Sequence, residues 1–126
     1  MALVLETGLR DAIADSIDTY INISTSSVLM FETAADSTVA QIDFQDPAFG
    51  AAATGVITMS GQPLSDTSAV GGTVEHFSIY LAPNKNTKVL EGTCGVGSGD
   101  IDMSSLTVGA TDTVELTTFT ITCPAS

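Results

Sequence analysis

The sequence predicts a mainly β protein: an antiparallel β-sandwich, jelly-roll or immunoglobulin-like, with one amphipathic helix at its N-terminus. Its 126 residues suit one domain with a single core. Only 14% of the residues are charged, and Thr, Ser, Asp and Gly supply most of the polar side chains. Short strand patterns follow one another after a single helical segment, as in sandwiches and barrels. We therefore expect one domain over residues 1–126, with an N-terminal arm (1–6), a helix (7–21) and a β-sandwich (27–123).

The helix is predicted by apolar residues that recur every three or four positions, with Asp11, Asp15 and Asp18 off that stripe. Thr7 can cap the first turn, because its hydroxyl can accept a hydrogen bond from a free backbone amide. A run of Asn, Ser and Thr at residues 22–27 favours a loop and ends the helix. The apolar stripe consists of Leu5, Leu9, Ala12, Ile13, Ile17 and Tyr20.

The apolar stripe has two interpretations. In the first, which we expect, the helix packs this stripe over one open end or face of the sandwich. In the second, the helix or the arm before it forms an interface with another subunit. For that arm, Leu3, Val4 and Leu5 are the residues that we expect to grip a neighbouring subunit.

The remaining chain is predicted to form strands and turns. Pro83-Asn84-Lys85-Asn86 supplies residues that tolerate turn geometry, which predicts a hairpin from Val74 to Gly92. In the last strand the apolar positions change parity near Thr117 and Thr118, so we expect a β-bulge there. Strands are expected at Val28 to Thr33, Val39 to Phe44, Gly55 to Ser60, Val74 to Leu81, Thr87 to Gly92 and Thr113 to Cys123, with shorter ones at Asp100 to Met103 and Leu106 to Val108.

Alternation along the predicted hairpin separates a core face from a polar face. Phe77, Ile79 and Leu81 share one face and are expected in the core. His76, Ser78 and Tyr80 share the other face, which is expected to lie at the surface or at an interface.

The charge of the chain limits its partners. Three Lys plus Arg against fifteen Asp plus Glu give a net charge of -12, which repels nucleic-acid phosphates and anionic lipid surfaces. No apolar window approaches the roughly 18 residues of a membrane span. The N-terminus lacks the basic start of a secretory signal. We therefore expect synthesis in a cytoplasm, with no direct nucleic-acid or membrane binding.

The sequence gives little indication of a metal or cofactor. Cys94 and Cys123 are too few for a disulfide framework and are not spaced as a metal knuckle; buried, reduced thiols are expected, with a bridge as the alternative. The acids of residues 99–102 and Asp66 could contribute to a calcium site, but their spacing matches no EF-hand loop. We expect solvated acids, no metal and no cofactor.

Catalysis is also not expected. His76 is the only histidine, and it lies in the middle of a strand pattern. The loop at residues 95–99 is rich in glycine but lacks the GK[ST] ending of a phosphate-binding loop. A glycosidase cleft or a carbohydrate-binding module needs exposed aromatic rings, and only Tyr80 and Phe31 could serve. The protein is therefore expected not to be an enzyme.

Four segments resemble a family of small structural proteins of tailed phages and prophages. They are the opening helix GLRDAIADSID (8–18), the block DPAFGAA (46–52), the hairpin from HFSIY to VLEGT (76–93) and the ending VELTTFTIT (114–122). The resemblance covers most of the chain. This chain departs from the family in having His76 where members usually carry a tryptophan, and in lacking a glycine in the hairpin turn.

The resemblance implies a capsid decoration or cement protein that binds the major capsid protein on the virion surface. The alternatives are a tail or head-to-tail connection protein and, from another class, a carbohydrate-binding or adhesin module. Shell proteins lie on symmetry axes, so we expect a homo-oligomer, with a trimer as the first expectation. The residues expected at subunit interfaces are Leu3, Val4, Leu5, Phe49, His76 and Tyr80.

Overall fold

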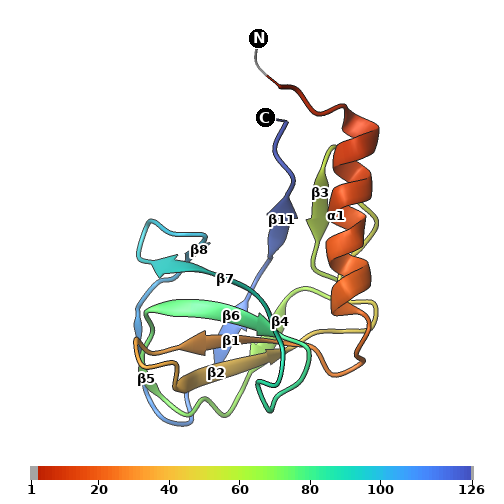
Figure 1. Cartoon of the computed structure of the whole chain (residues 1–126). Coiled ribbons are helices and arrows are strands. Elements are labelled where there is room, and N and C mark those ends of the chain that lie inside the picture. Colours follow the sequence, from red (N-terminus) through yellow and green to blue (C-terminus); the bar gives the residue numbers. More distant parts are fainter. Residues whose placement is uncertain (1–2, 126) are drawn as a thin grey trace.

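A computed structural model of the protein describes residues 3–125 (Figure 1). It is mainly β with one helix, and its strand pairs are mostly antiparallel, as the sequence predicts. One sheet has five strands in the order β2-β1-β6-β7-β8, and three smaller sheets pair β10 with β4, β11 with β3 and β5 with β9. The elements are α1 (Thr7–Ile21), β1 (Val28–Glu32), β2 (Thr38–Asp43), β3 (Val56–Thr58), β4 (Leu64–Asp66), β5 (Gly72–Thr73), β6 (His76–Tyr80), β7 (Lys88–Gly95), β8 (Ile101–Asp102), β9 (Thr107–Val108), β10 (Val114–Leu116) and β11 (Thr120–Thr122).

The five-stranded sheet is built around β1 and β6. These strands pair antiparallel, with Glu32 opposite His76 and Phe31 opposite Phe77. β6 and β7 form the predicted hairpin, and among the strands of residues 3–125 only β7 and β8 pair in parallel. Alternate side chains therefore face opposite sides of this sheet.

The last predicted strand is two strands. β10 pairs with β4 and β11 pairs with β3, so the chain changes partner between Leu116 and Thr120. The predicted β-bulge at Thr117 and Thr118 is therefore wrong: the change of parity marks a break between two small sheets. The strand patterns did not include β4 and β5, which are short and carry few apolar residues.

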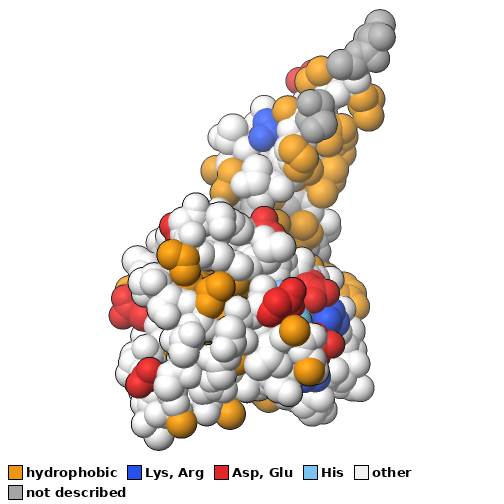
Figure 2. Space-filling model, turned by 90° about the vertical axis from the view of Figure 1, so that its left-hand side faces the viewer, with side chains coloured by type: hydrophobic (Ala, Val, Ile, Leu, Met, Phe, Trp, Pro, Cys, Tyr) orange, Lys and Arg blue, Asp and Glu red, His pale blue; other side chains and the backbone are white. Residues whose placement is uncertain are grey.

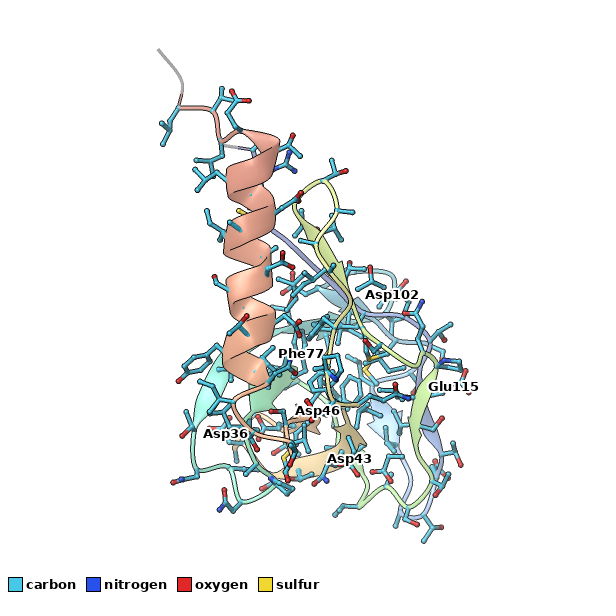
Figure 3. All side chains as sticks on the ribbon, turned by 90° about the vertical axis from the view of Figure 1, so that its right-hand side faces the viewer. Asp36, Asp43, Asp46, Phe77, Asp102 and Glu115 are labelled. Atoms are coloured by element: carbon cyan, nitrogen blue, oxygen red, sulfur yellow. The ribbon has the colours of Figure 1, made fainter. Side chains whose placement is uncertain are left out.

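Four phenylalanines join the parts of the core. Phe44 contacts Phe49, Phe49 contacts Phe119, and Phe119 contacts Phe77, with ring centroids 5.6, 6.1 and 5.5 Å apart. Phe77 belongs to the five-stranded sheet, and Figure 3 shows it at the centre of the packed side chains. These rings therefore join the sheet to the segments that run toward α1.

α1, β3 and β11 lie beside one another and project from the five-stranded sheet (Figure 1). Both ends of the described chain lie at the tip of this projection, where the Leu5 amide donates to the Ala125 carbonyl (2.6 Å). The helix has the predicted bounds, but Glu6 occupies the cap position and Thr7 is the first helical residue, so the predicted Thr7 cap is wrong. No helix among residues 3–125 is long and apolar enough to span a membrane.

Candidate functional site

The face of α1 that lies toward the protein is lined with polar acceptors. Asp11, Asp15, Asp18 and Asn22 recur at spacings of four, three and four residues, which places them on one side of the helix. Segment 48–55 runs beside them, and its backbone amides need acceptors because a buried unpaired amide is costly. The amides of Gly55, Ala52, Phe49 and Ala48 donate to Asp11 (2.6 Å), Asp15 (2.8 Å), Asp18 (3.1 Å) and Asn22 (2.9 Å) in turn.

Arg10 adds two further bonds at the same side of the helix. Its guanidinium donates from Nε to the Cys123 carbonyl (3.1 Å) and from Nη2 to the Thr54 carbonyl (2.9 Å). Gly55 lies directly against this side chain, at φ +78°, where a Cβ would meet Arg10. The helix is thus bonded both to segment 48–55 and to the end of β11.

Part of the apolar stripe consequently points away from the protein. Leu9, Ile13 and Tyr20 are 51%, 38% and 45% exposed, whereas Ala14 and Ile21, on the other side, are fully buried. Hydrophobic side chains line the projection in Figure 2. The prediction that the stripe packs over the sandwich is therefore wrong for Leu9, Ile13 and Tyr20, because the bonds from segment 48–55 turn the aspartate face inward, whereas Leu5 and Ile17 are half-buried against the core.

The predicted N-terminal arm is partly described. Residues 1–2 lie outside the described range. Leu3 and Val4 are 77% and 64% exposed, and Leu5 is half-buried where its amide bonds to Ala125. Leu3 and Val4 thus extend the apolar surface of the helix toward its N-terminal tip.

The other three predicted interface residues are buried inside the subunit. Phe49, His76 and Tyr80 are only 1%, 6% and 4% exposed. The prediction that the face of His76 and Tyr80 lies at the surface is wrong, because Lys85 in the turn after β6 and Lys88 at the start of β7 lie over the Tyr80 ring, 5.8 and 5.9 Å from its centroid. A subunit interface has to be formed by exposed residues instead.

A cluster of charged residues surrounds His76; we call Glu32, Asp36, Glu75, His76 and Glu91 the carboxylate cluster. His76 Nδ1 is hydrogen-bonded to Glu75. His76 Nε2 faces three carboxylate oxygens, at 3.0 Å from Asp36, 3.1 Å from Glu32 and 3.3 Å from Glu91. Burial lowers the pKa of His76, but the hydrogen bond to Glu75 and the charges of Glu91, Glu75 and Glu32 outweigh it and raise the pKa above its ordinary value.

Glu32 forms the floor of the cluster and is fully buried. Lys85 Nζ lies 2.8 Å from its Oε2, and the Tyr80 hydroxyl donates to it at 2.9 Å. Burial raises the pKa of Glu32, but Lys85, Ser78 and Tyr80 together outweigh it and hold the pKa below its ordinary value. Burial and the bond to Glu32 raise the pKa of Tyr80 to about 12. The cluster around the only histidine thus also binds two of the three basic residues of the chain: Lys85 pairs with Glu32, and Lys88 pairs with Glu91.

The geometry around His76 does not resemble a nucleophilic centre. Both ring nitrogens face carboxylates, so neither is placed to take a proton from a serine or cysteine among the described residues. Phe31 and Tyr80, the two rings considered for a sugar site, are 2% and 4% exposed. Neither presents a free face on which a sugar could stack.

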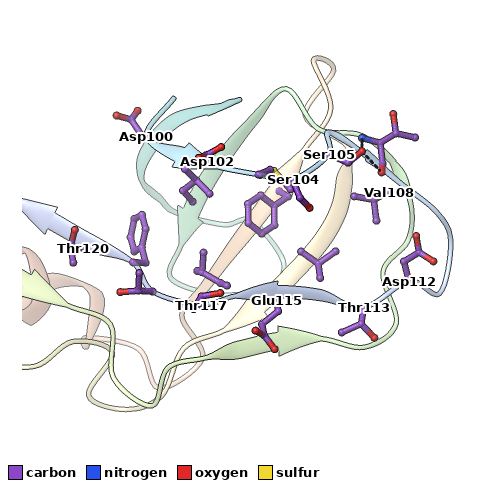
Figure 4. A pocket seen from close by; sticks show the side chains of 18 residues that line it. Asp100, Asp102, Ser104, Ser105, Val108, Asp112, Thr113, Glu115, Thr117 and Thr120 are labelled. Carbon is purple, nitrogen blue, oxygen red and sulfur yellow. Dashed lines mark hydrogen bonds between the residues drawn. The ribbon is translucent and has the colours of Figure 1, made fainter. Parts of the chain in front are cut away.

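A separate hollow lies between residues 100–108 and 112–120 (Figure 4). Its volume is about 640 Å³, and threonines and acids line much of it. Asp100 accepts from the Thr93 amide and Asp102 from the Gly97 amide, at 2.9 and 2.6 Å. Asp66, the third acid considered for calcium, accepts instead from Gln41 on β2. These acids therefore bond to neighbouring loops and strands.

The sequence patterns missed the carboxylate cluster. Its one visible signal is Glu32, a single acid at the end of the apolar run VLMF. The other members come from the turn after β1 and from β6 and β7, which only the fold brings together. Comparison of the chain with protein-family models, with curated proteins and with solved structures finds no match.

Proposed function

We propose that this protein is a non-enzymatic structural component of a tailed-phage virion that works by binding other protein subunits. The outward apolar face of α1 carries the proposal. Of the eight large hydrophobic side chains that are exposed in the described chain, six lie between residues 3 and 23: Leu3, Val4, Leu9, Ile13, Tyr20 and Ile23.

Exposed apolar side chains that gather on one element favour burial against another protein. A helix normally turns its apolar stripe toward its own core, and here hydrogen bonds from segment 48–55 hold it outward. The net charge of -12 disfavours phosphate backbones and anionic lipid surfaces as the covering partner. Copies of this chain and a shell protein are the partners that we propose, with a trimer as the oligomer.

The size of the helix face favours repeated contacts. A helix of 15 residues is about 22 Å long and 10 Å wide, so its stripe covers on the order of 200 Å² in projection. A stable interface buries about 800 Å² on each partner. One such stripe is therefore too small alone, whereas a symmetric oligomer bound at many equivalent positions gains strength from avidity. This arrangement suits a decoration protein on the major capsid protein, the role that the sequence resemblance implies.

Gold-labelled antibody against the protein, applied to phage particles from the source culture and located by electron microscopy, tests the proposal. Label spread over the capsid is the expected result. Label confined to the tail or neck would replace decoration with a tail or connector role. Intact particles without label, from a culture in which immunoblotting detects the protein, would overturn the virion role altogether.

A further inference from the structure

The carboxylate cluster holds more negative charge than its own cations balance. Four carboxylates surround one imidazole, and Lys85 and Lys88 are the basic residues that contact the cluster in the described chain. If His76 Nδ1 carries the ring proton toward Glu75, the lone pair of Nε2 faces three anionic oxygens. That arrangement is repulsive unless a second proton or a metal cation lies among these atoms.

We propose that His76 Nε2, Glu32 Oε1 and Asp36 Oδ1 bind a divalent transition-metal ion of the zinc type. The ligand atoms of Glu32, Asp36 and His76 lie within 4.8 Å of one another. Ligands at about 2.0 Å from a tetrahedral zinc ion are about 3.3 Å apart. The distances from Nε2 to Asp36 and Glu32, 3.0 and 3.1 Å, are close to that spacing.

The surrounding contacts are those that a histidine metal site uses. A ligating imidazole usually donates its other N–H to a carboxylate, which fixes its tautomer and orientation, and Glu75 holds that position on Nδ1. Lys85 and the Tyr80 hydroxyl hold Glu32, whose Oε1 is the ligand atom. The imidazole nitrogen favours zinc-like ions over calcium or magnesium, which prefer oxygen ligands.

Ser78 is an independent sign of an unfilled polar site. It lies between His76 and Tyr80 on the same face of β6, and it is fully buried. It lies close enough to Glu32 to lower the pKa of that carboxyl, yet its Oγ has no hydrogen-bond partner at bonding geometry in the described chain. A buried hydroxyl of this kind is uncommon unless a water or an ion completes its surroundings.

The cluster is also accessible from solvent. The side chains of Asp36, Glu75 and Glu91 are 62%, 59% and 48% exposed, while Glu32 lies at the bottom. Figure 2 shows acidic side chains gathered on one side of the body, with the histidine and basic side chains beside them. A bound ion would join β1, the turn after it, β6 and β7, and would stabilise the five-stranded sheet.

Titration of the chelator-treated protein with Zn²⁺ by calorimetry, and with Co²⁺ by its visible absorption, tests this site. We expect one ion per chain, the absorption of tetrahedral Co²⁺, and a higher melting temperature with Zn²⁺. Asp36→Asn should weaken binding about tenfold or more, because it removes one ligand charge. Asp36 lies in an exposed turn at φ +64°, a conformation that Asn tolerates, so this variant should fold.

Asp43→Asn is the matched control, because Asp43 is an exposed acid at the other end of the β1–β2 pair, opposite Val28. It should bind Zn²⁺ as the unchanged protein does. His76→Gln should lose Zn²⁺ binding as Asp36→Asn does. Absence of stoichiometric binding by the unchanged protein would overturn the proposal, and so would equal affinity of Asp36→Asn and Asp43→Asn. If the unchanged protein does not bind the ion, then a proton on His76 and the charges of Lys85 and Lys88 are sufficient to balance the carboxylates.

Discussion

The Asp18 carboxylate on α1 accepts a hydrogen bond of 3.1 Å from the backbone amide of Phe49, which lies 31 residues later in the chain. This bond joins the two most recognisable segments of the sequence, the helix at residues 8–18 and the block at residues 46–52. It also orients both of them: Phe49 points into the aromatic core, and the aspartate face of the helix turns inward. The outward position of the apolar stripe follows from this contact.

Replacing Asp18 by Ala should therefore destabilise the protein. The change removes the acceptor of the Phe49 amide and of the Asn22 side chain, and lost hydrogen bonds to charged groups cost about 1–3 kcal/mol. Burial raises the pKa of Asp18, so the hydrogen-bond acceptor at this position matters more than its charge. Asp18→Asn keeps an acceptor oxygen and should therefore lower the unfolding free energy much less than Asp18→Ala. Urea unfolding measures the difference. Ser16→Ala, on the exposed side, is the control; an equal effect of both Ala variants would contradict this role.

The fold class and most strand positions could be predicted from the sequence, because strands and turns carry local patterns. The orientation of α1 could not. Periodicity identifies an apolar stripe and an aspartate stripe but does not show which one faces the protein. That choice depends on backbone amides of segment 48–55, which only the folded chain brings beside the helix.

The carboxylate cluster was hidden for a similar reason. Alternation correctly places Phe77 and His76 on opposite faces of the sheet, but it predicts that the face of His76 is at the surface, whereas that face is buried. Lys85, in the turn after β6, covers that face and reaches Glu32 on β1, 53 residues earlier, at 2.8 Å. The pattern of neighbouring residues in the sequence does not predict a contact between residues so far apart in the chain.

Gly92→Ala should destabilise the hairpin. Gly92 lies opposite Phe77 in the β6–β7 register, and a Cβ there would overlap the Phe77 ring. The ring contacts Phe119 edge-on and is 2% exposed, so it has little room to move. Overpacking of this kind costs about 1–3 kcal/mol. Thermal and urea unfolding should show this loss, whereas Gly8→Ala, with no atom within 4 Å of its added Cβ, should show none.

Lys85→Gln should be much more destabilising than Lys88→Gln in chelator-treated protein. Lys85 pairs with the fully buried Glu32, and removing one partner of a buried pair costs about 3 kcal/mol. Lys88 pairs at 3.6 Å with the exposed Glu91, a contact of about 0.5 kcal/mol. Both lysines lie over the Tyr80 ring, so Lys88→Gln controls for the loss of that contact.

The difference between Lys85→Gln and the unchanged protein should also depend on pH. Lys85 helps to hold the pKa of Glu32 below the ordinary 4.5, so its stabilisation is present above that pH and is lost as pH falls through the lower, folded-state value. The difference in unfolding free energy should therefore shrink as pH falls below about 4.5. A constant difference between pH 7 and pH 3 would mean that Lys85 acts through packing alone.

Cys94 should be a slow thiol at neutral pH. Burial and then the charges of Asp100 and Glu75 raise its pKa from 9.0 to about 11, so about 0.1% is thiolate at pH 8. Its iodoacetamide alkylation rate, followed by peptide mass spectrometry, should keep rising past pH 9 toward pH 11. Asp100→Asn should shift this profile to lower pH. A rate that levels off near pH 9 would contradict the raised pKa.

Combined replacement of Leu9, Ile13 and Tyr20 by Ser should separate assembly from folding. These side chains are exposed in the subunit, so their loss should change its unfolding free energy by about 0.5 kcal/mol or less each. If the stripe joins copies of the chain, light scattering after size-exclusion chromatography should show a trimer for the unchanged protein and a monomer for the variant. Val70→Ser with Val96→Ser is the control, because these residues are 67% and 60% exposed but lie outside α1. An oligomer that survives the first set of changes and dissociates with the second would assign the contact to another surface.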